Sequence, residues 1–175
     1  VNGPGPFVIG SNITTGGSQT YNGPVQLNGG TTPLTLSSSG NGATILFAST
    51  STLDGNGSRA LTVSATGTGG SVVFDGTVGG TTPLGGLTTN STTFSAGALA
   101  IGSGGLSVTT SGTATLNGNI TTSGGTVGFD GAVVLDAPTI SVDTTDGGTV
   151  AAGAGVTFTG TVDNASTTAE SLTVN

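Results

Sequence analysis

The stretch Phe74-Asp75-Gly76-Thr77-Val78 contains a pattern that returns along the chain: an aromatic residue, any residue, glycine, any residue and valine. Three strict copies and one looser copy accompany it. They are Tyr21-Asn22-Gly23-Pro24-Val25, Phe129-Asp130-Gly131-Ala132-Val133, Phe158-Thr159-Gly160-Thr161-Val162 and, more loosely, Leu116-Asn117-Gly118-Asn119-Ile120. Repetition of this kind is typical of units that cannot bury their apolar side chains alone and therefore stack on their neighbours.

A second motif, Leu-Thr-Val or a close variant, follows most of these copies at a steady distance. It occurs at Leu34-Thr35-Leu36, Leu61-Thr62-Val63, Leu106-Ser107-Val108, Ile140-Ser141-Val142 and Leu172-Thr173-Val174. Key apolar positions also recur at a nearly constant interval, at Tyr21, Leu34, Phe47, Leu61, Phe74 and Leu87. A half-unit of about 13 residues predicts a coil of about 26 residues in a β-solenoid, whereas the looser spacing between Leu87 and Ile140 indicates a variant coil.

The predicted interior of this solenoid consists of the apolar residues that recur at equivalent places. They are Tyr21, Val25, Phe47, Leu61, Phe74, Val78, Phe129, Val133, Phe158, Val162 and Leu172.

The rest of the sequence supports an all-β fold. Helical periodicity is absent, and 35 glycines separate short runs of threonine, valine and leucine. A β-sandwich is the alternative, because its hairpins also bring a turn every 8–12 residues or so. We favour the parallel solenoid because stacked coils place like residues on like, and a sandwich has no reason to repeat its sequence. No linker interrupts residues 1–175, so we expect a single repetitive segment.

Charge and residue types exclude several classes of function. The chain carries one Lys or Arg, eight Asp or Glu and a net charge of −7. A partner made of nucleic acid or anionic lipid requires clustered cations, so neither is expected. Membrane insertion is not expected either, because no apolar run approaches the roughly 20 residues that span a bilayer. Histidine, cysteine and lysine are absent, which removes the usual general base, thiol nucleophile and Schiff-base amine. We therefore predict a protein that is not an enzyme.

Carboxylates remain as the residues that carry chemistry. The nearest candidate pairs for acid–base catalysis are Asp143 with Asp146 and Asp130 with Asp136. Aspartates on turns, however, mostly accept hydrogen bonds from the backbone amides of the turn. Asp75 and Asp130 occupy equivalent motif positions and would stack. We expect no cofactor, and calcium bound by such stacked carboxylates is the weak alternative.

Hydroxyl and amide side chains give two further patterns. A regular array of Thr-x-Thr pairs could order water and bind ice. Such pairs occur at Thr66/Thr68, Thr113/Thr115 and Thr157/Thr159, but they do not recur in step with the repeat. Ordinary β-propensity explains them better. Asparagines in Asn-x-Ser/Thr sites are candidates for glycosylation, at Asn12, Asn56, Asn90, Asn119 and Asn164.

Three stretches resemble repeats of giant bacterial surface adhesins, the filamentous-haemagglutinin-like and autotransporter-like passengers. They are Gly16-Gly17-Ser18-Gln19-Thr20-Tyr21-Asn22-Gly23-Pro24-Val25, Val73-Phe74-Asp75-Gly76-Thr77-Val78-Gly79-Gly80-Thr81-Thr82-Pro83-Leu84 and Ser171-Leu172-Thr173-Val174-Asn175. The resemblance covers most of the chain from about Ile13. It implies a right-handed parallel β-helix at the cell surface and transfers no catalytic residue.

The expected function is therefore structural or adhesive and extracellular. A host or cell-surface ligand would bind a lateral face, and neighbouring repeats would pair with the strand edges. The alternative is a subunit that assembles head to tail with identical copies into a filament or surface layer. This alternative rests on the sequence ending within a repeat motif, at Leu172-Thr173-Val174, without a visible cap.

Overall fold

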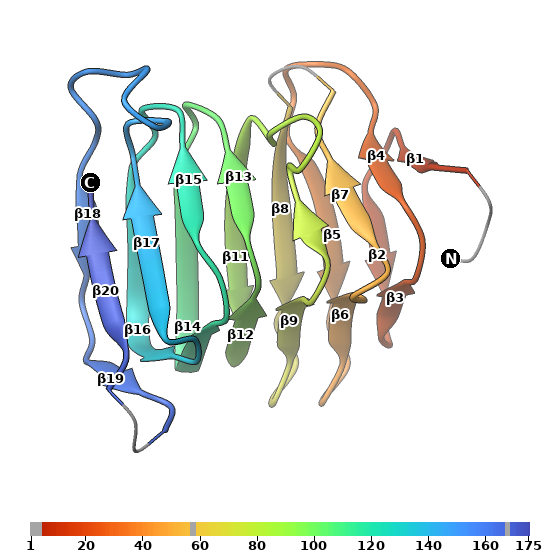
Figure 1. Cartoon of the computed structure of the whole chain (residues 1–175). Helices are drawn as coiled ribbons and strands as arrows, with labels where there is room; N and C mark the ends of the chain where they lie inside the picture. The colour runs from red at the N-terminus through yellow and green to blue at the C-terminus, as the bar shows by residue number, and fades with distance from the viewer. Residues whose placement is uncertain (1–4, 57–58, 167–168) are drawn as a thin grey trace.

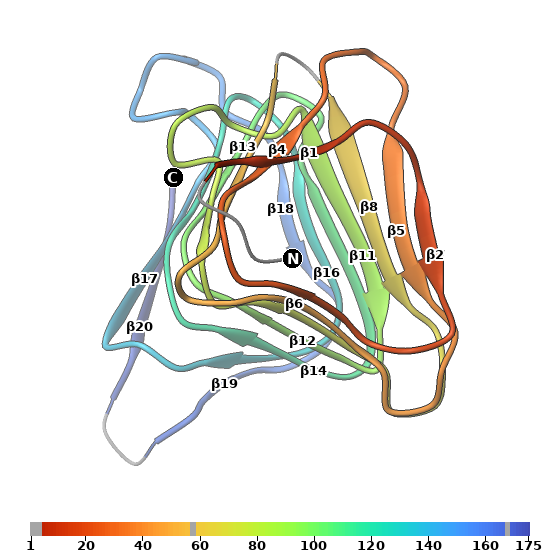
Figure 2. The ribbon, with the colours of Figure 1, turned by 90° about the vertical axis from the view of Figure 1, so that its right-hand side faces the viewer.

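The computed structural model describes residues 5–56, 59–166 and 169–175, which contain twenty β-strands and no helix. The chain winds as a three-sided solenoid, and each coil contributes one segment to each of three faces, here called face A, face B and face C (Figure 1). Viewed along the axis from β1, the chain runs clockwise as it recedes, so the solenoid is right-handed (Figure 2).

Face A is one parallel sheet of eight strands. Its strands in order are β1 (Phe7–Ile9), β4 (Val25–Leu27), β7 (Thr52–Asp54), β10 (Thr77–Val78), β13 (Leu99–Ile101), β15 (Ile120–Thr122), β17 (Thr139–Asp143) and β20 (Ser171–Val174).

Faces B and C are joined, because two long strands bend around the corner between them. Face B consists of β2 (Ile13–Thr15), β5 (Leu34–Ser38), β8 (Ala60–Ala65), β11 (Gly86–Ser91), β18 (Val156–Phe158) and the first parts of β14 (Leu106–Leu116) and β16 (Val127–Leu135). Face C consists of β3 (Gln19–Tyr21), β6 (Thr44–Phe47), β9 (Ser71–Phe74), β12 (Thr93–Ala96), β19 (Val162–Asn164) and the last parts of β14 and β16.

Strand pairing establishes the parallel solenoid and rules out the sandwich. Every named strand pair is parallel, and each strand pairs with its counterpart one coil away; Leu34 faces Leu61, for example, and Phe47 faces Phe74. The one antiparallel bridge among the described residues, between Ser123 and Thr145, lies outside the strands. Inward Val, Leu, Ile and Phe thus form ladders along the axis, while Thr and Ser alternate outward.

Each coil has three sides, so the half-units of about 13 residues do not correspond to single faces. The step from Tyr21 to Leu34 passes from face C across face A to face B, and the next step, to Phe47, leads back to face C. The early coils do have close to the expected length, since Leu34 pairs with Leu61. In the irregular region the coils shorten: Leu87 pairs with Leu106 and Leu106 with Val127.

Burial separates the predicted interior residues into two groups. Those in the earlier coils are all at most 3% exposed, namely Tyr21, Val25, Phe47, Leu61, Phe74, Val78, Phe129 and Val133. In the last coil, Phe158 and Leu172 are only partly buried, and Val162 is 39% exposed and so lies outside the core. The last coil has a neighbouring coil on one side only, which explains this difference.

Aromatic rings stack along the axis in two places. On face C, the ring centroids of Tyr21 and Phe47 lie 4.6 Å apart and those of Phe47 and Phe74 lie 5.1 Å apart. On face B, the rings of Phe129 and Phe158 stack at 5.5 Å. Such stacked pairs contribute about 0.5–1.5 kcal/mol each beyond their buried area.

The recurring pentapeptide forms a corner of the solenoid, with its glycine at the bend. A Cβ at Gly76 would overlap the carbonyl oxygen of Ser51 in the preceding coil, and one at Gly118 would lie 2.7 Å from the backbone nitrogen of Ala98. Only glycine lets the coils approach this closely. The copy at Phe74 turns the corner from face C to face A, whereas the copy at Phe129 turns from face B to face C.

Candidate binding face

The outward side chains of face B form two columns that run along the axis. Residues in a column are partners in register between neighbouring strands. The first column is Thr35, Thr62, Thr88, Ser107, Gly128 and Thr157, and the second is Thr14, Ser37, Ser64, Asn90, Thr109 and Asp130. We call these twelve positions the hydroxyl face, because nine of them are Thr or Ser.

The geometry of a parallel sheet sets the spacing of these groups. Neighbouring strands lie about 4.8 Å apart, and alternate residues on one strand lie about 6.6 Å apart. The hydroxyl face is therefore a two-dimensional array with one repeat along the solenoid axis and another along the strands.

Most hydroxyls in the middle of this array are free to bind an external group. At one end Thr14 and Ser37 share a hydrogen bond of 3.0 Å, and at the other the Thr159 hydroxyl donates to Asp130 at 3.0 Å. Between these ends, six side chains make no hydrogen bond to any described residue. They are Thr62, Ser64, Thr88, Asn90, Ser107 and Thr109.

The other two faces mix hydroxyls with other side chains; face C, for example, has Thr44, Ser71 and Thr93 in register, but Thr93 donates a hydrogen bond to Ser71 at 3.0 Å. Outward apolar residues interrupt face C at Leu46, Val73 and Val134, each half-buried. Face A carries exposed Val8 together with two carboxylates, Asp54 and Asp143. The hydroxyl face has neither a large apolar side chain nor a cation, and Asp130 is its one charged member.

The single cation of the chain supports the fold from a corner. The Arg59 guanidinium donates from Nε to the carbonyl of Thr32 at 2.8 Å and from Nη1 to the carbonyl of Asn28 at 3.0 Å. These contacts join one coil to the loop of the preceding coil.

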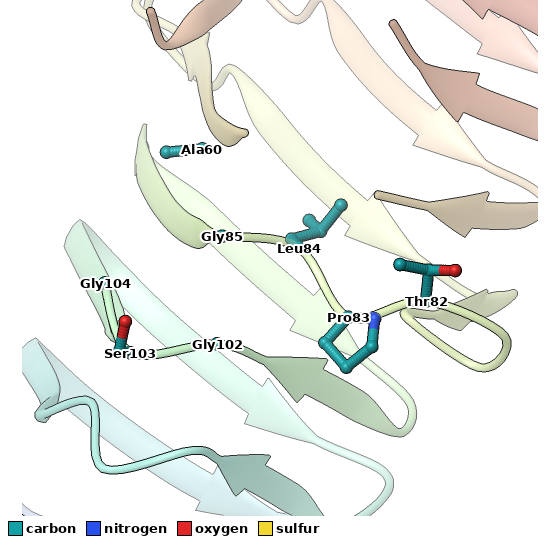
Figure 3. Close-up of a pocket in the computed structure, with 8 residues that line it drawn as sticks. All are labelled: Ala60, Thr82, Pro83, Leu84, Gly85, Gly102, Ser103 and Gly104. Carbon is teal, nitrogen blue, oxygen red and sulfur yellow. The ribbon is translucent and has the colours of Figure 1, made fainter. Parts of the chain in front are cut away.

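Two hollows in the surface of the described residues contain no constellation for catalysis. A hollow of about 360 Å³ lies where the coils begin to shorten (Figure 3). Its lining is Ala60, Thr82, Pro83, Leu84, Gly85, Gly102, Ser103 and Gly104, which offer two hydroxyls and no charge. A smaller hollow of about 120 Å³ lies on the hydroxyl face, where Gly128 lacks a side chain between Ser107 and Thr157.

Asp143 and Asp146 lie at the end of β17 and in the loop that follows it. The Asp143 carboxylate accepts hydrogen bonds from the Thr145 hydroxyl at 2.6 Å, the Thr145 amide at 2.7 Å and the Gly147 amide at 3.1 Å. These donors, the Thr145 hydroxyl first, lower the pKa of Asp143. Asp146 has a φ of 53° and accepts a hydrogen bond from the Ser123 hydroxyl at 3.0 Å. The Asp143 carboxylate therefore organises the turn, and the Asp146 carboxylate links it to the preceding coil. The lowered pKa of Asp143 suits an acceptor and not a general acid.

The other aspartate predictions also change with the structure. Asp130 ends the face B part of β16 and Asp136 follows its face C part, so the two stand at opposite ends of one side of the solenoid. Asp75 lies at the corner between faces C and A, so the expectation that it stacks with Asp130 is wrong. The two copies of the motif turn different corners. Among the described residues, no group of three Asp or Glu side chains could hold a metal ion.

The three Thr-x-Thr pairs considered above lie in unrelated places. Thr66 and Thr68 lie in the turn after β8, Thr113 and Thr115 belong to the face C part of β14, and only Thr157 and Thr159 lie at face B. The regular array was missed because its pairs read Thr-x-Ser, Thr-x-Asn and Ser-x-Thr. Register between coils, which the sequence alone does not show, aligns them.

The asparagines of the five candidate glycosylation sites are all exposed. Asn12, Asn56, Asn90 and Asn164 are exposed, although Ser58 of the Asn56 site lies outside the described residues. Asn119 is exposed as well, and its Oδ1 accepts a hydrogen bond from the Ser141 amide at 2.9 Å.

Comparisons with known proteins identify no relative: no family model, no curated protein and no solved structure matches this chain. The described residues also include no helix that is long and apolar enough to cross a membrane.

Proposed function

We propose that this chain is an extracellular structural and adhesive segment that holds the hydroxyl face as a lateral binding surface. The observation that supports this most directly is the in-register array of unpaired hydroxyls along face B, which no large apolar side chain interrupts. A continuous ladder of backbone hydrogen bonds and a buried core make a stiff support, and the outer groups stand at fixed spacing.

The array favours adhesion over catalysis or charge-driven binding. It provides many weak, equivalent contacts, which add up only against a ligand that touches several coils at once. An extended surface can contact many of these groups at once, whereas a small soluble ligand would contact only a few of them.

The test is retention of the purified chain on extended neutral surfaces under flow. Beads that carry the chain should be held on at least one neutral solid, such as cellulose, chitin or ice. Thr88→Tyr on the hydroxyl face should release the beads, and Thr115→Tyr on face C is the matched control. Equal retention of both variants and the parent would contradict a role for this face. Antibody labelling of intact cells of the source organism tests the extracellular location.

A second candidate function rests on the strand edges. Within the structure β1 pairs only with β4 and β20 only with β17, so each has one unpaired edge. Such edges are templates for pairing with a similar strand, which supports head-to-tail assembly of copies. Electron microscopy at several concentrations separates the two: long uniform filaments favour the subunit, and short monodisperse rods favour the adhesive segment.

A further inference from the structure

We propose that the ligand of the hydroxyl face is ice, bound through water molecules held in register by the two columns. The proposal rests on the proposed function, because it requires that this lateral face is the adhesive one. It adds the chemical class of the ligand.

The first argument is periodicity in two dimensions. Column partners repeat about every 4.8 Å along the axis, and the two columns are about 6.6 Å apart. A ligand that engages Thr62, Thr88 and Ser107 together with Ser64, Asn90 and Thr109 must itself repeat in both directions. An ice surface is a planar lattice of water oxygens with repeats of this order.

The second argument is the chemistry of the groups. Each Thr or Ser hydroxyl is both a donor and an acceptor, and so is each water of an ice surface. The face lacks outward aromatic rings, which would provide a stacking platform for sugar rings. It also lacks the clustered carboxylates that a charged mineral surface would need, since Asp130 is alone. A neutral lattice of small hydrogen-bonding groups is the ligand that remains.

The third argument is preorganisation. Threonine has a restricted χ1, and Thr62 and Thr88 lie in strands paired on both sides. Their hydroxyls and methyl groups thus stand at nearly fixed positions before any ligand arrives. Binding then orders few side chains, which lowers its entropic cost.

The experiment measures incorporation of the labelled chain into a slowly growing ice hemisphere. Because lysine is absent, an amine-reactive dye attaches at the N-terminal amine of the purified chain. We expect the chain to be enriched in the ice relative to an unrelated protein of similar size. Thr88→Tyr should reduce incorporation about tenfold, a loss of about 1.4 kcal/mol. Thr115→Tyr should leave it unchanged.

The outcomes separate this proposal from the function on which it rests. Exclusion of the parent chain from ice, or equal loss in both variants, overturns ice binding. If ice excludes the chain while cellulose or chitin retains it in a Thr88-dependent way, the ligand is a polysaccharide and the lateral face stands. If no surface shows a Thr88-dependent effect, both proposals fail. Circular dichroism must show native β-structure in each variant, and Thr109→Tyr replaces Thr88→Tyr if the latter does not fold.

Discussion

The two aromatic stacks of this solenoid arise from one sequence motif but lie on different faces. The Tyr21–Phe47–Phe74 stack runs along face C through the longer early coils, whereas the Phe129–Phe158 pair lies on face B. The motif therefore encodes a corner with an aromatic residue before it, and not a fixed place on the circumference. Where coils shorten, the same corner is used at another edge of the prism.

The stacks also differ in how completely the coils enclose them. Phe47 is 1% exposed and has stacked rings on both sides, while Phe158 has a ring on one side and is only partly buried. Equal residues in equal motifs should thus contribute unequally to stability, and substitutions can test how far this holds.

The largest effect is expected from Phe47→Ala. It removes the middle ring of the first stack and should lower the free energy of unfolding by about 3–5 kcal/mol. Phe158→Ala, its counterpart in the second stack, should cost about 1–2 kcal/mol because less area is lost. Urea denaturation followed by circular dichroism measures both. Equal losses would remove the distinction between the stacks.

The corner glycine of the first stack is the next most sensitive position. In Gly76→Ala the new methyl group meets the Ser51 carbonyl, so the coils must separate, at a cost of about 1–3 kcal/mol. Gly155→Ala is the matched control, since a Cβ there meets no atom within 4 Å, and its effect should stay within about 0.5 kcal/mol. A tolerated Gly76→Ala would show that close approach does not select glycine at corners.

Tyr21 gives the first stack a pH dependence that the second cannot have. Burial raises the pKa of Tyr21 to about 12, above the value near 10 expected in the unfolded chain. The folded state therefore keeps its proton where the unfolded state loses it. The resulting stability is complete below pH 10 or so and declines between about pH 10 and 12, by on the order of 1–2 kcal/mol. Denaturation at several pH values should show this decline in the parent and a flatter profile in Tyr21→Phe.

The smallest effects are expected for carboxylates that link coils beside the stacks. Asp54 accepts hydrogen bonds from the Thr81 and Thr82 amides at 2.8 and 3.2 Å, so Asp54→Ala should cost about 0.5–1.5 kcal/mol and Asp54→Asn less. Asp130 accepts one bond from the exposed Thr159 hydroxyl, and Asp130→Ala should be nearly neutral. A larger loss for Asp130 than for Asp54 in the same denaturation assay would reverse this order.

The sequence predicted the parallel solenoid because the motifs repeat identical residue types at steady intervals. It did not reveal the third face, since the step from Tyr21 to Leu34 skips face A. It also placed Asp75 and Asp130 together, because identical pentapeptides do not say which corner they turn. The hydroxyl face was missed for a related reason: only the register between coils aligns Thr62, Thr88 and Ser107.

The direction of the backbone ladder has a mechanical consequence. Hydrogen bonds between coils run along the solenoid axis, so tension applied to the two ends of the stack loads one pair of neighbouring coils at a time. The stack should peel apart in sequence and at low force, and each released coil of roughly 20–30 residues would add roughly 70–100 Å of contour length. Load applied across the axis is shared by many coils, so a lateral contact would withstand much more force than a pull on the ends.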